Sequence, residues 1–129
     1  MKKTFVSGPV NLLGLIIGFI ISKILEKNNA SKLVKEAKKN GVKIGAHPSF
    51  PDKEGFGRKP IDISCAALFK SLEDQTNRLL KHLKDANAAL HHIKPHGALY
   101  NLAAKDERTA NIVVELMKCF VLVFIGYCK

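Results

Sequence analysis

One stretch, residues 42–58 (VKIGAHPSFPDKEGFGR), constrains the fold of this chain more than any other. It opens with a short alternating run, residues 42–46, which predicts a β-strand that enters a core. The run breaks at His47, because Pro48 biases the preceding backbone away from helix. A polar loop with two acids, two bases and two glycines follows. A strand that ends in a histidine before such a loop is typical of α/β active sites, because the strand fixes the side chain and the loop presents backbone N–H groups.

A second stretch, residues 92–101 (HIKPHGALYN), repeats this design. Because the ends of successive parallel strands share one rim of an α/β sheet, we expect His47 and His96 to lie close together. Lys94 precedes His96 by two residues, so its side chain lies on the same face of an extended segment. Two histidines and a lysine can bind an anionic or carbonyl-bearing ligand and move protons. We therefore predict that His47, Lys94 and His96 are catalytic.

Three further residues are candidates for substrate binding. Arg58 could clamp a carboxylate or phosphate through two parallel hydrogen bonds, although a solvated role is equally open. Asp52 lies in the same loop. Gly97 is expected first to mark tight backbone and second to allow close approach of a ligand.

A metal site is a minor alternative. His91 and His92 should face opposite sides of a strand, so they cannot form a paired site alone. A zinc site from His47, His96 and one of these two histidines stays open, but no ligand motif supports it.

The apolar periodicity predicts helices at residues 31–40, 64–87 and 106–118, with a second strand near residues 90–94. Asn40 and Gly41 stop the first helix, Asp62 or Ser64 caps the second, and Asp106 starts the third. This alternation predicts an α/β fold with two or three parallel strands. The residues expected to face the core are Leu68, Leu72, Leu79, Leu83 and Ala86 in the second helix and Ala110, Val113, Val114 and Met117 in the third.

Both ends of the chain are apolar, so we divide it into residues 1–30, residues 31–118 and residues 119–129. The run at residues 12–21 (LLGLIIGFII) is shorter than the roughly 20 residues of a spanning helix, so a membrane anchor through residues 5–25 stays open beside a buried element. Residues 11–27 are predicted to be helical, and residues 120–128 (FVLVFIGYC) are predicted to be a strand.

The net charge of +10 comes from 21 basic against 11 acidic residues. Such a balance favours contact with nucleic acids or anionic membranes. The lysines are spread along the predicted helices and no nucleic-acid motif occurs, so we expect a solvated basic surface and no nucleic-acid partner. The cysteines, Cys65, Cys119 and Cys128, show no ligand spacing, and their odd number fits a reducing cytoplasm; membrane association is the alternative location.

The motifs IGAHPSFPDKEGFGR and KPHGALYN together resemble the LamB/YcsF family, which includes the A subunit of bacterial 5-oxoprolinase. The resemblance runs from about residue 41 to about residue 114. It implies a (β/α) barrel of the glycoside hydrolase and deacetylase type. It also implies ATP-dependent hydrolysis of 5-oxoproline to L-glutamate together with two partner subunits. ATP use rests on the resemblance alone, because the chain has no P-loop.

The size of the chain departs from the family pattern. A closed (β/α) barrel takes roughly 250 residues, whereas this chain has 129. An ACGFHAG-like run with a further active-site histidine is absent, and Asn11 is the candidate remnant of its start. The resemblance therefore implies a truncated or frame-disrupted member that is inactive alone. The alternatives are a membrane-associated or partner-binding remnant without activity and a metal-dependent, deacetylase-like hydrolase.

Overall fold

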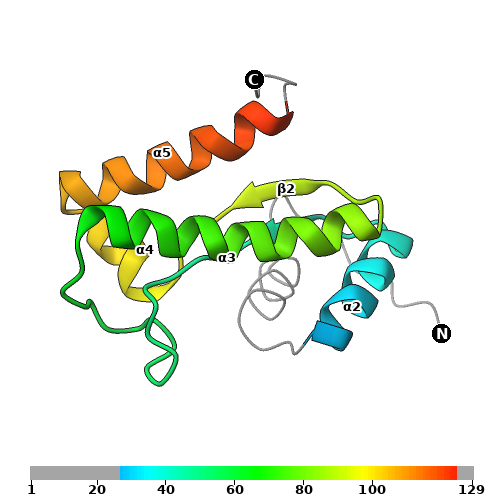
Figure 1. The fold of residues 1–129 in the computed structure, drawn as a ribbon, viewed down its shortest axis with the longest axis horizontal. Coiled ribbons are helices and arrows are strands. Elements are labelled where there is room, and N and C mark those ends of the chain that lie inside the picture. Colours follow the sequence, from blue (N-terminus) through cyan, green and yellow to red (C-terminus); the bar gives the residue numbers. More distant parts are fainter. Residues whose placement is uncertain (1–26, 125–129) are drawn as a thin grey trace.

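The computed structural model describes residues 27–124 of the chain. Its elements, in order, are α2 (Lys27–Lys39), β1 (Ile44–Ala46), α3 (Cys65–Asp85), β2 (Leu90–Ile93), α4 (Gly97–Ala103) and α5 (Glu107–Phe124). Helix α3 runs alongside β2, with α2 towards one end and α4 towards the other (Figure 1). The predicted alternation of helices and strands is confirmed for these residues, and α4 is an additional short helix.

The two strands form a parallel pair, as predicted. The paired residues are Ile44 with Leu90, Gly45 with His92 and Ala46 with Ile93. One step along β1, from Ile44 to Gly45, therefore corresponds to two steps along β2, from Leu90 to His92. The extra residue, His91, forms a β-bulge. The α/β class is thus confirmed, while the (β/α) barrel implied by the resemblance stays a prediction.

Hydrogen bonds at the helix ends show why the elements begin and end where they do. Gly41 has a φ of 67°, and the N–H of Val42 donates to the Ala37 carbonyl at 2.9 Å, which ends α2 at the predicted glycine. The Ser64 hydroxyl accepts from the Ala67 N–H at 3.2 Å and so caps α3. The Asp106 carboxylate accepts from the N–H of Thr109 at 2.8 Å at the start of α5.

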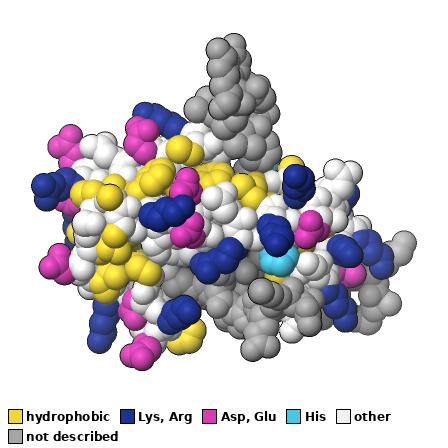
Figure 2. Space-filling view, viewed as in Figure 1, with side chains coloured by type: hydrophobic (Ala, Val, Ile, Leu, Met, Phe, Trp, Pro, Cys, Tyr) yellow, Lys and Arg dark blue, Asp and Glu magenta, His cyan; other side chains and the backbone are white. Residues whose placement is uncertain are grey.

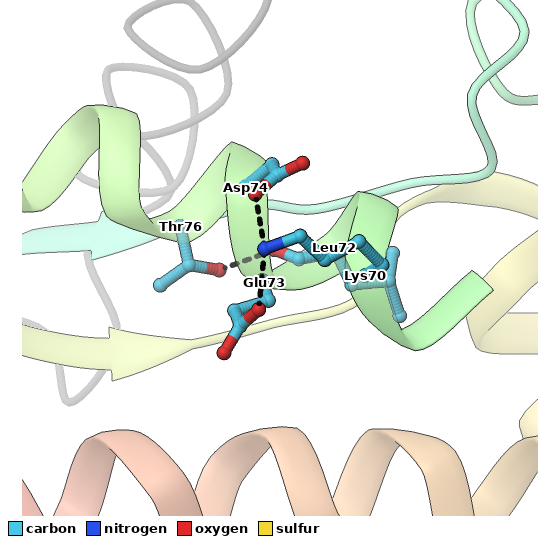
Figure 3. Close-up of polar contacts among 5 residues, drawn as sticks. All are labelled: Lys70, Leu72, Glu73, Asp74 and Thr76. Carbon is cyan, nitrogen blue, oxygen red and sulfur yellow. Dashed lines mark hydrogen bonds and ion pairs between the residues drawn. The ribbon is translucent and has the colours of Figure 1, made fainter. Parts of the chain in front are cut away.

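Helix α3 separates a charged outer face from a buried inner face. On its outer face Lys70 lies 3.0 Å from Glu73 and 3.1 Å from Asp74 (Figure 3). Such exposed pairs add little stability. On the inner face the buried Thr76 hydroxyl donates to the Leu72 carbonyl at 2.9 Å, which satisfies it inside the helix.

The core confirms most of the predicted apolar positions. The four leucines predicted on α3 are all at most 3% exposed. On α5 the prediction is wrong at Val114, which is 45% exposed, while Leu116 is fully buried. Helical spacing explains the difference, because Leu116 follows the buried Val113 by three residues and precedes the buried Phe120 by four.

The prediction of a strand at residues 120–128 is wrong over residues 120–124, because α5 continues to Phe124. The helix also crosses the boundary that we placed between residues 118 and 119. Residues 11–26 of the predicted N-terminal helix lie outside the described residues, as does the apolar run at residues 12–21. Within residues 27–124 no helix is long and apolar enough to cross a membrane.

Charged side chains are interspersed on the face shown in Figure 2, where basic and acidic groups alternate instead of forming one basic stripe. The expectation of a solvated surface and of no nucleic-acid partner stays a prediction.

A matched pair of substitutions on α5 tests the packing. Leu116→Ala should lower the free energy of unfolding by about 2–5 kcal/mol, because it removes a fully buried side chain and leaves a cavity. Val114→Ala should change it by less than about 0.5 kcal/mol, because that side chain is largely solvated. Urea unfolding followed by circular dichroism measures both. Equal losses would contradict the described orientation of α5.

Candidate functional site

The structure brings His47 and His96 into direct contact. Their rings have centroids 4.8 Å apart and planes at 70°, and Nδ1 of His96 lies 3.0 Å from Nε2 of His47. The other nitrogen of His47, Nδ1, lies 2.5 Å from the carbonyl oxygen of Lys94. The expected proximity of the two histidines at one rim is therefore what the structure shows.

The partners of this pair determine where its protons lie. A carbonyl oxygen only accepts, so Nδ1 of His47 carries a proton and donates to Lys94. In a neutral His47, Nε2 is then an acceptor and Nδ1 of His96 donates to it. If the pair takes up one further proton, the same bond can reverse. Two linked imidazoles can thus store or transfer a proton at this rim.

Backbone pairing beyond β1 and β2 places the two rings. The N–H of Lys94 donates to the Ala46 carbonyl at 2.9 Å, and the N–H of His96 donates to the Pro48 carbonyl at 2.8 Å. The extended pairing therefore continues past the strand ends on both sides of His47. Since Pro48 favours this extended backbone, the sequence itself fixes where the His47 side chain can point.

A buried amide, which the sequence analysis missed, holds the next residue. Oε1 of Gln75 accepts from the Ser49 N–H at 3.1 Å, and its Nε2 donates to the Ser49 carbonyl at 2.9 Å. Ser49 is fully buried, and Gln75 is 7% exposed. The position of Gln75 three residues after Leu72 and four before Leu79, on the core stripe of α3, was the available signal. A polar residue on a buried stripe indicates an amide with buried partners.

The glycine-containing loop is folded back onto itself and onto α4. Oδ1 of Asp52 accepts from the Gly55 N–H at 2.8 Å, and the Asp52 carbonyl accepts from the Gly57 N–H at 2.9 Å. The Gly57 carbonyl in turn accepts from the Ala98 N–H at 3.1 Å. Asp52 therefore has a structural task in shaping the loop, and its predicted role in substrate binding stays a prediction.

Gly97 begins α4 at the closest approach of this loop. Its φ is +55°, and a Cβ built on it would lie 2.7 Å from the Gly57 carbonyl oxygen. The tight backbone predicted for Gly97 is therefore observed. Arg58 is exposed and its Cα lies 3.5 Å from that Cβ position, so its backbone is adjacent to the residue that follows His96. Lys94 is also exposed. Contact of Arg58 or Lys94 with a substrate stays a prediction.

The histidines of β2 depart from the expected alternation. Nδ1 of His91 lies 3.1 Å from Nδ1 of His92, with ring centroids 5.3 Å apart. The prediction that they face opposite sides is wrong, because the bulge at His91 interrupts the regular two-residue period. Among residues 27–124, no group of three or more His, Cys, Asp or Glu could hold a metal ion, so the zinc alternative is not assembled there.

His92 packs over β1. Its Nε2 is buried without a hydrogen-bond partner among the described residues and lies where a Cβ on Gly45 would be. Burial lowers the pKa of His92, and the positive charges of His91, Lys94 and Lys43 lower it further. We therefore expect a neutral His92 in the folded chain.

Three backbone N–H groups of the glycine-containing loop are engaged within the loop. A phosphate-binding loop needs several backbone N–H groups that point at the ligand. Here the N–H groups of Gly55 and Gly57 donate to Asp52, and that of Arg58 donates to the Gly55 carbonyl at 3.0 Å. These three donors are therefore not directed at a ligand, and ATP binding stays a prediction.

Comparison with known proteins shows the family of this chain. The model of the LamB/YcsF family matches residues 26–128. The chain belongs to the LamB/YcsF family. The match is wider than the resemblance at residues 41–114, because it also includes α2 and all of α5.

Individual LamB/YcsF relatives give the same result. The chain is 46% identical over 87 residues to the 5-oxoprolinase A subunit of Haemophilus influenzae (strain PittEE), covering 67% of the chain and 36% of the relative. It is 38% identical over 103 residues to the 5-oxoprolinase A subunit of Staphylococcus aureus (strain Newman), covering 78% and 41%. The chain therefore spans less than half the length of these relatives.

A solved structure is also similar. The lactam utilization protein from Thermus thermophilus matches with a TM-score of 0.66 and 41% sequence identity, over 70% of this chain and 36% of that one. The α/β arrangement described above is thus shared with a protein of known structure.

The Gln75 amide offers a first test of the site. Gln75→Leu should lower the free energy of unfolding by about 1–3 kcal/mol, because both backbone groups of the buried Ser49 lose their partners. Asn77→Leu, at an exposed position of the same helix, should change it by less than about 0.5 kcal/mol. Chemical denaturation measures both variants. An equally small loss of unfolding free energy in Gln75→Leu would show that the Gln75 amide does not hold Ser49 in place.

Acid should destabilise the chain partly through His92. Because the pKa of folded His92 is lowered, the unfolded state binds a proton at a pH at which the folded state does not. Stability should therefore fall as the pH drops below about 6.5, the ordinary histidine value, and His92→Gln should reduce this fall. The measurement is urea unfolding at about pH 7.5 and about pH 5.5. Asn111→Gln, exposed on α5, should keep the original pH dependence.

Proposed function

We propose that the described part of this chain carries one portion of a 5-oxoprolinase active site, which hydrolyses the lactam of 5-oxoproline to L-glutamate at the expense of ATP. The observation that carries the proposal is the contact between His47 and His96 at the carboxyl ends of two neighbouring parallel strands. This is the edge of an α/β sheet at which ligands bind. The names of the relatives, which are A subunits of 5-oxoprolinase, support the choice of reaction.

The histidine pair fits the proton transfers that this hydrolysis needs. Water adds its oxygen to the lactam carbonyl carbon, the carbon–nitrogen bond breaks, and the ring nitrogen gains a proton. A base must therefore take a proton from water, and an acid must deliver one to nitrogen. His47 and His96 share a hydrogen bond along which one proton can be held between these two steps.

The two exposed cations near this rim fit the charges of the substrate. The carboxylate of 5-oxoproline matches a guanidinium, which we assign to Arg58. The carbonyl oxygen gains negative charge during attack, and Lys94 can stabilise it because its backbone already holds His47. Gly97 keeps the backbone between these groups free of a side chain.

The chain alone should not complete the reaction. It spans 36% to 41% of the relatives that carry the name of the enzyme. Three backbone donors of the described loop are engaged within it, and in our proposal the groups that bind ATP lie elsewhere. The names of those relatives describe one component of a multi-subunit enzyme, so we propose that partner subunits are needed as well.

Glutamate release from 5-oxoproline in the presence of ATP tests this proposal. The 129-residue chain with the partner subunits of the Haemophilus influenzae enzyme should give no release above background, whereas the full-length relative should be active. The expected reason is that most of the site lies outside this chain. Turnover near that of the relative, lost on His96→Ala, would show that the described portion suffices.

A chimera tests the roles of the residues separately. In the chimera, the matching segment of this chain replaces the 87-residue segment of the Haemophilus influenzae relative. The rate of this chimera is the value with which each variant is compared. His47→Ala and His96→Ala should each lower its rate by roughly 10²-fold or more. His82→Gln should leave the rate unchanged, because His82 bonds to Ser31 at the other end of α3. Full activity without either site histidine would refute the proposed roles.

A further inference from the structure

A groove with apolar walls lies apart from the histidine rim. Its volume of about 670 Å³ falls within the range of small-molecule sites, roughly 300–1,000 Å³. The groove is lined by Lys38, residues 42–44, residues 87–93, Met117 and Phe120. It therefore receives side chains from α2, from both strands and from α5. Neither His47 nor His96 lines it, so the groove is separate from the candidate site described above.

Apolar side chains form the walls of this groove. Ile44 and Leu90 are buried in the core, whereas Val42, Ile93 and Met117 pack against the core and are only partly buried. The exposed part of these three side chains is apolar surface in contact with water, and covering such surface is favourable. The walls therefore suit a ligand with an apolar body.

The polar side chains that line the groove are basic or uncharged. They are Lys38, Lys43, Asn87, His91 and His92, and no Asp or Glu occurs among the described lining residues. Lys38 is already engaged, since its ammonium donates to the carbonyls of Ala86 at 3.1 Å and Asn87 at 2.7 Å. The Lys43 side chain is exposed, and within residues 27–124 its ammonium forms no hydrogen bond or ion pair. Lys43 is therefore a cation available to a ligand.

Basic side chains also gather around His92. Nδ1 of the exposed His91 lies 3.1 Å from Nδ1 of His92. Burial lowers the pKa of His92, and the charges of His91, Lys94 and Lys43 lower it further, so all three groups lie close enough to act on one ring. No carboxylate of the described residues acts on this pKa in the opposite sense. Such a cluster of like charges is unfavourable until an anion joins it.

We propose that this groove binds an amphipathic carboxylate, which is a small molecule with an apolar body and one carboxylate at its end. The apolar body lies against the walls from β1, β2 and α5, and the carboxylate accepts hydrogen bonds from the Lys43 ammonium and the His91 ring. Hydrogen bonds between a carboxylate and a cationic donor are among the stronger ones in proteins.

Charge complementarity selects this occupant over others. A neutral apolar molecule fills the same volume but leaves Lys43 without a partner, and a cationic one is repelled by the basic cluster. The inference does not depend on the proposed reaction, because the residues assigned to that reaction lie outside the groove lining.

Binding of octanoate to the full 129-residue chain tests the inference. Calorimetry should give octanoate an affinity roughly tenfold or more above that of 1-octanol, which lacks the charge, and above that of acetate, which lacks the apolar body. Octyltrimethylammonium, a cation with the same apolar chain, should not bind. Amide signals in NMR spectra should shift at residues 87–93 and at Met117, while circular dichroism should show an unchanged helix content.

Two matched pairs of variants locate the site. Lys43→Gln should weaken octanoate binding by roughly tenfold or more by removing the cationic donor, whereas Lys81→Gln, exposed on α3 outside the groove lining, should bind like the original chain. Ala89 is exposed and lines the groove, so Ala89→Glu should weaken binding by a similar factor through repulsion of the carboxylate. Ala66→Glu, exposed in the first turn of α3 outside the lining, should leave the affinity unchanged.

Several outcomes would overturn the inference. These are absence of octanoate binding, equal affinity for octanoate and octyltrimethylammonium, NMR shifts confined to residues outside the groove, and equal effects of Lys43→Gln and Lys81→Gln. Shifts at the groove residues that grow with the concentration of the chain alone, without octanoate, would instead identify a second copy of the chain as the occupant.

Discussion

The parallel pairing of β1 and β2 beyond their own ends is the constraint on which the candidate site depends. Two backbone bonds, from Lys94 to Ala46 and from His96 to Pro48, keep the segments that follow the strands at sheet spacing. His47 lies between these bonds, and its ring reaches the Lys94 carbonyl on one side and His96 on the other. The histidine contact is thus a consequence of strand register, and a shift by one residue would remove it.

Helix α3 stabilises this strand register by holding the segment that follows β1. Its leucines fill the core, and Gln75 bonds to the backbone of Ser49 at both its N–H and its carbonyl. Burial of an amide is tolerated because every one of these polar groups finds a partner. A buried polar group that loses its partner costs more free energy than a formed hydrogen bond contributes. The two Gln75 bonds therefore disfavour other positions of the Ser49 segment more than they add to the net stability of the fold.

The parts of the fold that the sequence predicted are those set by local patterns. The leucine stripe of α3, the glycine stop after α2 and the parallel strands follow from spacing and backbone preference. Three features depend instead on distant contacts. Helix α4 begins at Gly97 against the Gly57 carbonyl, the bulge at His91 arises from pairing with β1, and α5 stays helical to Phe124 although its apolar run resembles a strand. Short apolar runs do not distinguish helix from strand by themselves.

For the site, the sequence predicted that two histidines share one rim, but it did not predict the hydrogen bonds that decide where their protons lie. In the loop that follows His47, three backbone N–H groups donate to Asp52 and to the Gly55 carbonyl. The rim thus combines two histidines and two exposed cations with three N–H donors that are already engaged within the loop. Lactam hydrolysis needs such donors where charge develops on the carbonyl oxygen. In the proposed reaction, further donors of this kind come from the part of the family fold that this chain does not span.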